Sequence, residues 1–247
     1  MTAQLVKLET APDLVDQVYT SLLDAICDGS LAPGERITQE DIAERLAVSR
    51  QPVLQALRLL KKDGFVHDVN SEAGAGARGR GVLVAPLDAA WMVKVYQVRG
   101  ALDALAARLA AALRTRIDPK LIEQGRKAAR GRNVKAMIDA DLAFHSAIYA
   151  ASGNPLIEQS AAQHWRHLRR VMGAVLQQSK QREALWDEHE AIASAIAAGN
   201  GDRAARMIEE HSQHASDNLA ARLGDVLKPA KEAGNEADKR ATRAFRP

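Results

Sequence analysis

Along most of the chain, hydrophobic residues recur every three or four positions, the spacing that places them on one face of a helix. Before residue 65 this pattern predicts three helices. The second and third are separated only by Ala47 and Val48, a break that predicts a tight helix-turn-helix. The expected helices cover residues 13–27, the stretch TQEDIAERLA and the stretch SRQPVLQALRLLKKDG, with Ser49 as the N-cap of the last.

Two short β-branched runs follow, GFVHDV and GVLVA, on either side of the glycine- and arginine-rich segment 70–81. Alternating β-branched runs joined by such a segment are typical of a hairpin with a long tip. Pro86 then ends the second strand and marks a domain boundary. Residues 1–86 are therefore expected to form a winged helix-turn-helix with a small β wing.

The remainder of the chain shows helical periodicity alone, which predicts an all-α antiparallel helical bundle over residues 87–224. Residues 225–247 are charged and poor in large apolar side chains, and we expect a disordered tail there. The bundle helices are expected near 88–115, 119–130, 133–151, 155–179, 182–198 and 202–224. The stripe expected to anchor the first of them to the bundle is Trp91, Val95, Val98, Leu102, Leu105, Leu109 and Leu113.

Composition narrows the class of protein further. No apolar run is long enough to span a bilayer, and the N-terminus lacks the hydrophobic segment of a secretion signal, so a cytoplasmic protein is expected. Cys27 is the only cysteine, which excludes an internal disulfide framework and a cysteine-rich zinc site. Any metal site must therefore use histidine and carboxylate ligands.

Charge is distributed unevenly over the first 86 residues. They contain nine Lys and Arg against twelve Asp and Glu, yet residues 45–63 contain five basic side chains and Asp63 as their only acid. Arg45 belongs to this basic group. A basic face on an otherwise acidic domain indicates directed contact with the phosphates of a nucleic acid. The alternative is a solvated helix face in an unrelated helical protein.

The stretch DIAERLAVSRQPVLQALRLLKKDGFV, with PGERIT before it and GRGVLVAPLD after it, resembles the winged helix-turn-helix of GntR-family transcription regulators. The resemblance implies DNA contacts by residues on the recognition helix, before it and in the wing. Leu54-Gln55 stands where the family usually has Arg-Glu, so an apolar contact to a thymine methyl is expected in place of one basic contact. The implied contact residues are Arg36, Ser49, Arg50, Gln51 and the wing residues Gly79, Arg80 and Gly81.

Polar residues interrupt three apolar stripes of the second half. Asp141 and His145 lie one turn apart on one helix, and His189 and His211 lie equally far from Asn200 on two helices joined by a turn. Four such donors converging in a helical core would suit Zn²⁺, Ni²⁺ or Mn²⁺. The alternative for each histidine is a core residue satisfied by its neighbours.

Residues 88–224 resemble the FCD effector domain of the FadR branch of GntR regulators, through DLAFHSAIYAASGNP and EHEAIASAIAAGNGDRAARMIEEH. The resemblance implies that Asp141, His145, His189 and His211 hold a divalent metal beside a cavity for a small organic acid. Arg99 falls where the family often points an arginine inward, and Asp103 stands where a glutamate is common. A surface ion pair between Arg99 and Asp103 is the alternative.

These patterns together predict a homodimeric transcription regulator, a repressor, that binds double-stranded operator DNA and responds to a small carboxylate effector. It is not expected to be an enzyme. The alternative is a metal-dependent hydrolase with a DNA-binding appendage, although no carboxylate besides the ligands is an evident general base. A helical interaction module with merely packed histidines is the third possibility.

Overall fold

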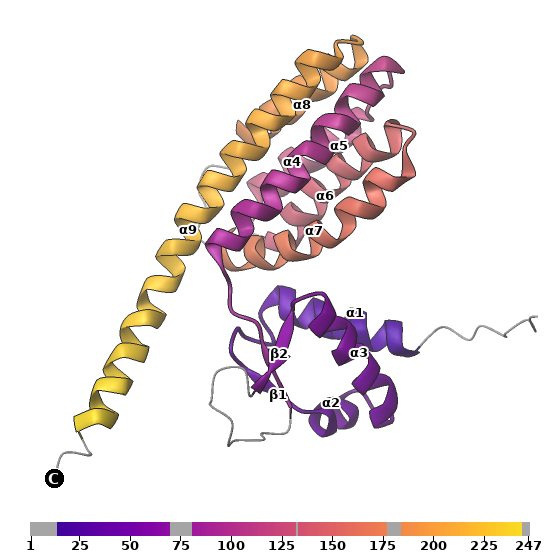
Figure 1. Cartoon of the computed structure of the whole chain (residues 1–247). Coiled ribbons are helices and arrows are strands. Elements are labelled where there is room, and N and C mark those ends of the chain that lie inside the picture. Colours follow the sequence, from indigo (N-terminus) through magenta and orange to yellow (C-terminus); the bar gives the residue numbers. More distant parts are fainter. Residues whose placement is uncertain (1–13, 70–80, 132, 177–183, 244–247) are drawn as a thin grey trace, which may run out of the picture. The chain divides into compact units, whose positions relative to one another are not determined.

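A computed structural model of the chain describes residues 14–69, 81–131, 133–176 and 184–243, with side chains described as far as Val226. The chain divides into two compact units between Pro86 and Leu87. Each unit has its own hydrophobic core. The first combines short helices with a small sheet, and the second is a bundle of longer helices (Figure 1).

The helices of the first unit are α1 (Leu14–Asp28), α2 (Gln39–Arg45) and α3 (Arg50–Lys62). The predicted tight turn joins α2 to α3, and Ala47 within it adopts a left-handed φ of +52°. Thr38 caps α2 by accepting a hydrogen bond from the backbone N–H of Asp41. Ser49 occupies the N-cap position of α3, as expected, but its side chain makes no capping hydrogen bond.

α3 has one buried and one exposed face. Val53, Leu57 and Leu60 are buried in the core that α1 shares. On the opposite side the helix presents Arg50 and Gln51 to solvent, with further basic residues in its later turns. This arrangement leaves the N-terminal turn of α3 free to contact another molecule.

The sheet consists of β1 (Arg36–Ile37), β2 (Val66–Asp68) and β3 (Val82–Val84), antiparallel in the order β1-β3-β2. The predicted hairpin of β2 and β3 is confirmed, with Val66 opposite Val84. β1 was not predicted, because two residues are too few to show an alternating pattern. The tip of the wing at residues 70–80, which includes Gly79 and Arg80, lies outside the described residues.

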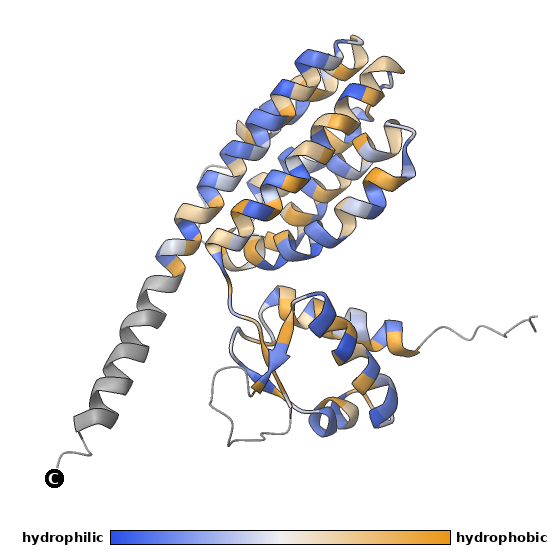
Figure 2. Cartoon of the chain, viewed as in Figure 1, coloured by the Kyte–Doolittle hydropathy of each residue, from blue (hydrophilic) through white to orange (hydrophobic). Residues whose placement is uncertain are grey.

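The bundle of the second unit consists of α4 (Ala89–Ala112), α5 (Pro119–Arg130), α6 (Val134–Ala151), α7 (Pro155–Val175), α8 (Ala184–Ala197) and α9 (Gly201–Arg243). Side-chain oxygens of Asp88, Asp118, Asn133 and Asn154 cap the first four of these helices. Hydrophobic residues gather where the helices face one another, and polar residues cover the outer surfaces (Figure 2). The expected all-α bundle is confirmed.

The expected core stripe of α4 is wrong in part. Trp91 and Val98 are each 51% exposed and Leu113 is 65% exposed, whereas Val95 is buried. The buried face of α4 instead carries mostly small residues, including Ala104 and four further alanines. Small side chains let α9 lie close against α4, so the larger apolar residues of α4 are left on the outside.

The predicted disordered tail also differs from the structure, because α9 continues as one helix from Gly201 to Arg243. The residues beyond Gly224 are rich in Ala, Glu, Lys and Arg, which have high helix propensity. That propensity outweighs the helix-breaking effect of Pro229 and Gly234, on which the expectation of disorder was based. Among the described helices, none is long and apolar enough to cross a membrane.

Candidate metal centre and nucleic-acid interface

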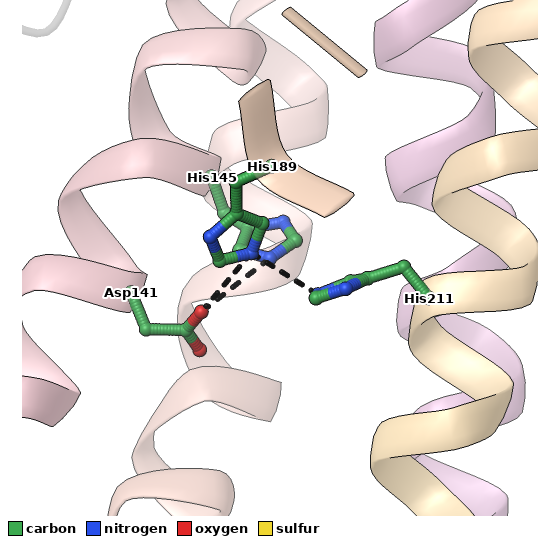
Figure 3. A group of neighbouring side chains, drawn as sticks. All are labelled: Asp141, His145, His189 and His211. Atoms are coloured by element: carbon green, nitrogen blue, oxygen red, sulfur yellow. Dashed lines mark hydrogen bonds and ion pairs between the residues drawn. The ribbon is translucent and has the colours of Figure 1, made fainter. Parts of the chain in front are cut away.

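Four buried side chains from three helices converge in the bundle. Asp141 and His145 come from α6, His189 from α8 and His211 from α9, and each offers one donor atom within 4.8 Å of the other three. Figure 3 shows the four side chains pointing toward one another. The structure therefore brings together all four residues that the sequence pattern singled out.

The spacing of these donors fits a metal ion. The Nε2 atoms of His189 and His211 are 3.2 Å apart, and Asp141 Oδ1 lies 3.4 Å from His189 Nε2 and 4.0 Å from His145 Nε2. Donors about 2.1 Å from a common ion are separated by about 3 to 4 Å. Asp141 Oδ1 is also buried without a hydrogen-bond partner, which is costly for a carboxylate oxygen. A cation at the centre of the cluster would satisfy it.

The turn between α8 and α9 explains why two of the histidines meet. Gly199 adopts a φ of +76°, and Asn200 accepts a hydrogen bond from the backbone N–H of Arg203 at the start of α9. The two helices then run antiparallel from this turn, so residues equally far from Asn200 lie at the same height. His189 and His211 are each eleven residues from Asn200.

Glu188 holds the His211 ring from the outer side, a contact that the sequence analysis missed. His211 Nδ1 donates to Glu188 Oε2 over 2.8 Å, which leaves Nε2 as the atom facing the cluster. This hydrogen bond also lowers the pKa of Glu188 below its usual value. His214, one turn after His211 on α9, is 66% exposed, and its Nδ1 lies 3.7 Å from the same carboxylate.

Arg99 and Asp103 form an ion pair inside the bundle. Arg99 Nε lies 3.0 Å from Asp103 Oδ2, and the two side chains are 2% and 0% exposed. Arg99 therefore points into the bundle, as the family resemblance implied. It also pairs with Asp103 one turn later, as the alternative held, but this ion pair is buried and not on the surface. Its guanidinium lies over the Trp165 ring at 4.2 Å, and its Nη2 lies 2.8 Å from His145 Nε2.

Asp103 also accepts hydrogen bonds from the hydroxyls of Tyr149 and Ser212. Burial alone would raise the pKa of the Asp103 carboxyl, but the Arg99 charge, the neighbouring His145 and the Tyr149 hydrogen bond hold that pKa well below its usual range. Burial likewise raises the pKa of Tyr96 to about 12, so its phenol stays protonated.

Two histidines of the cluster, His145 and His189, are held in their neutral form. Burial lowers the pKa of His189 well below its usual value, and the neighbouring His211, His145 and Arg99 lower it further. Burial and Arg99 also lower the pKa of His145. Neutral imidazole is the form that coordinates a metal, so these shifts favour coordination at neutral pH.

A cavity of about 190 Å³ lies beside the cluster, and Arg99, Asp141 and His211 form part of its lining. Trp186 forms another part and packs edge-on against His189, with ring centres 4.6 Å apart. This packing depends on Gly125 of α5, where an added Cβ would lie 2.0 Å from the Trp186 ring. The other lining residues are Tyr96, Ala129, Met137, Met172, Val175, Leu176, Leu185, Ala215, Asn218, Leu219 and Arg222.

The expected DNA-binding residues lie on the exposed side of the first unit. Arg36 is exposed on β1, Arg45 on α2, and Ser49, Arg50 and Gln51 at the start of α3. Arg50 Nη1 lies 3.2 Å from Glu40 Oε1, in an ion pair whose members are both largely exposed. Such a pair is worth little in water, so Arg50 is free to exchange it for a nucleic-acid contact.

Leu54 is half-buried, one turn after Arg50 on α3. Gly81 has a structural reason of its own: its φ is +115°, and a Cβ there would lie 2.6 Å from the carbonyl oxygen of Ile37. Close approach of the sheet backbone therefore requires glycine at this position.

The fold and these surfaces define a winged-helix DNA-binding regulator that carries a separate helical domain. Residues 14–74 match the family described as bacterial regulatory proteins, gntR family, and residues 94–214 match the FCD domain. The chain belongs to the GntR family of bacterial transcription regulators and has a C-terminal FCD domain.

Individual relatives agree with this assignment. The HTH-type transcriptional regulator LutR of Bacillus subtilis is 31% identical over 215 residues, which cover 79% of this chain and 96% of LutR. The B. subtilis regulator YdhC, described as uncharacterized, is 27% identical over 92% of this chain and 98% of its own. The relatives are transcription regulators and not enzymes, which removes the metal-dependent hydrolase alternative.

Among solved structures, McbR/YncC of E. coli has the same fold. It matches with a TM-score of 0.71 at 20% identity, over 86% of this chain and 100% of its own.

Proposed function

We propose that the protein is a metal-containing repressor whose affinity for its operator is controlled by a small organic carboxylate bound in the FCD domain. The observation that carries the proposal is the convergence of four buried donors beside a cavity that Arg99 also lines. A pocket of this kind, apolar with a few convergent polar groups, is typical of a small-molecule site.

Asp141, His145, His189 and His211 would hold the ion, with Zn²⁺, Ni²⁺ and Mn²⁺ as the candidates. When bound, it would supply a positive centre that can bind a carboxylate. The four protein donors complete a tetrahedral site but leave two positions open on an octahedral ion. Arg99, positioned by Asp103 and by the Trp165 ring, would add a charge-assisted hydrogen bond to the same carboxylate.

The exposed side of the first unit would bind the operator, with α3 in the major groove. Ser49, Arg50 and Gln51 would reach base edges and phosphates from the start of that helix, and Leu54 would approach a thymine methyl. Arg36 and Arg45 would contact the backbone, and Gly79, Arg80 and Gly81 of the wing would approach the minor groove.

A homodimer would match the two-fold symmetry of such an operator. The exposed face of α4 supports self-association, because Trp91, Val98 and Leu105 recur every seven residues there and are 51%, 51% and 41% exposed. Large apolar residues at this spacing on a solvent-facing helix suit pairing with a second helix.

The deciding experiment compares metal-loaded and chelator-stripped protein in two measurements, titration calorimetry with organic acids and fluorescence anisotropy with operator DNA. We expect stripping to abolish acid binding and to leave operator binding largely intact, because the donors lie in the FCD domain. Equal acid affinity with and without metal would make the metal structural only and would contradict its proposed role.

The DNA side is tested with Arg50→Ala, using Arg203→Ala on the exposed surface of α9 as the matched control. We expect Arg50→Ala to weaken specific operator binding by about 1–3 kcal/mol, the value of a bidentate base contact. An unchanged sequence preference in footprints of this variant would remove Arg50 from the base-reading role.

A further inference from the structure

The cavity beside the cluster is elongated along α9. Its α9 lining residues recur every three or four positions on one face of the helix, beginning at His211 and ending at Arg222. Eleven residues at a rise of about 1.5 Å separate these two levels by about 16 Å along the helix axis. The cavity therefore has an inner end at the cluster and an outer end at Arg222.

Between these ends the walls are mostly apolar, with Asn218 of α9 as a polar side chain among them. Met137 of α6, Met172 and Val175 of α7, and Trp186 of α8 face Leu219 of α9 across the cavity. Methionine side chains adapt to the shape of a partner, and the Trp186 ring offers a flat surface. These walls suit a hydrocarbon segment and offer it few hydrogen bonds.

Charged residues line the cavity at both ends. Arg99 and Asp141 lie at the inner end, where Asp103 already pairs with Arg99. Arg222, partly buried at the outer end, forms no ion pair with any described residue. An anionic group at the outer end would therefore find an available guanidinium.

We infer that the cavity takes an α,ω-dicarboxylate with an apolar spacer, one carboxylate at the inner end and the other on Arg222. The inference rests on the proposed function, because the proposed function places the inner carboxylate beside the metal and Arg99. With C–C bonds of about 1.5 Å, extended suberate separates its carboxyl carbons by about 9 Å. The Arg222 side chain, which extends from α9 into the cavity, covers the rest of the distance.

The test uses calorimetry on the manganese-loaded full-length protein, because an octahedral ion keeps positions open beside the four protein donors, with suberate, octanoate and succinate as probes. Suberate should bind about tenfold or more tightly than octanoate, which has the same chain length but only one carboxylate. Succinate should bind more weakly than suberate, because it is too short to reach both ends. Quenching of tryptophan fluorescence gives a second readout, since Trp186 lines the cavity.

Arg222→Gln should weaken suberate binding about tenfold or more and octanoate binding much less, so that the preference for suberate is lost. Arg203→Gln, on the same helix but outside the lining, is the matched control and should keep the preference.

Equal affinity of the wild-type protein for suberate and octanoate would overturn the inference and leave a site for monocarboxylates. Tightest binding by succinate, or an Arg222→Gln variant that binds all three acids equally more weakly, would also overturn it. Binding of none of the three acids by manganese-loaded protein would overturn the inference as well, whereas the proposed function fails only if no organic acid in the comparison of metal-loaded with stripped protein binds.

Discussion

Asp103 connects the buried polar side chains of the bundle to one another. Its carboxylate accepts hydrogen bonds from Tyr149 and Ser212, pairs with Arg99 and lies 3.5 Å from His145 Nδ1. A buried arginine without such a partner would cost several kcal/mol. Asp103 therefore stabilises the folded bundle and also positions two residues of the proposed effector site.

Glu188 gives a test of how the His211 ring is positioned. Glu188→Met keeps a side chain of similar size but has no oxygen to accept from His211 Nδ1. Loss of such an outer partner typically costs 10–100-fold in metal affinity, and a loss of that size is expected here. Zinc affinity is measured by competition with a chromophoric chelator. Glu190→Met, at an exposed carboxylate on the same helix, is the control, and equal affinity of both variants would exclude the orienting role.

The buried histidines also predict a pH dependence of stability in the chelator-stripped protein. The folded-state pKa values of His145 and His189 lie below 6.5, near which histidine titrates in the unfolded chain. Below pH 6.5 the unfolded chain therefore binds more protons, and the free energy of unfolding should fall by up to about 1.4 kcal/mol per histidine between pH 7.5 and 5.5.

Urea unfolding of the stripped protein at pH 7.5, 6.5 and 5.5 measures this dependence. His189→Asn removes one of the two groups, so its stability should fall less steeply with decreasing pH. A wild-type stability that is the same at pH 5.5 and 7.5 would show that the histidines are not held neutral.

At the scale of elements, the contact between α5 and α8 depends on the absence of a side chain at Gly125. Gly125→Ala would place a Cβ within the Trp186 ring, so the ring or the helix must shift. We expect a loss of about 1–3 kcal/mol in the free energy of unfolding and weaker zinc binding, because Trp186 packs on His189.

Gly224→Ala is the matched control, since an added Cβ there meets nothing within 4 Å. Alanine has the higher helix propensity, so this variant should be unchanged or up to about 1 kcal/mol more stable. Urea unfolding compares the two. A Gly125→Ala variant as stable as the control would mean that α5 and α8 separate at no cost.

Elements with one apolar face were predictable from the sequence. The buried face of α3 and the pairing of β2 with β3 follow directly from periodicity, and both are confirmed. α4 was not predictable in this way, because it has large apolar residues on one face and small ones on another. Periodicity measures hydrophobicity and not size, so it selected Trp91 and Val98 over Ala104.

The candidate site was predictable where its pattern is local. Asp141 and His145 are one turn apart, and His189 and His211 flank a recognisable turn, so their convergence follows from helix geometry. The contact of Ser212 with Asp103 spans 109 residues of sequence, and no local pattern reveals it. The same holds for Arg222, whose role depends on which helices surround the cavity.

At the scale of the whole molecule, the exposed face of α4 leads to a prediction about assembly. The double variant Val98→Glu, Leu105→Glu places two charges in the apolar row, which should weaken a dimer formed through it at least tenfold. Sedimentation velocity over a range of protein concentrations measures the change. Lys120→Glu with Lys127→Glu, exposed residues of α5 and away from the apolar row, is the control, and a Val98→Glu, Leu105→Glu variant that remains dimeric would place the interface elsewhere.

The ribosome synthesises the DNA-binding unit first and the four proposed metal donors afterwards. The DNA-binding unit ends at Pro86, but the last donor, His211, and the α9 wall of the cavity are translated more than a hundred residues later. A polypeptide truncated between these points would contain the recognition helix without a complete metal site. A frameshift in this interval is therefore expected to yield fragments that recognise the operator half-site but do not respond to the acid.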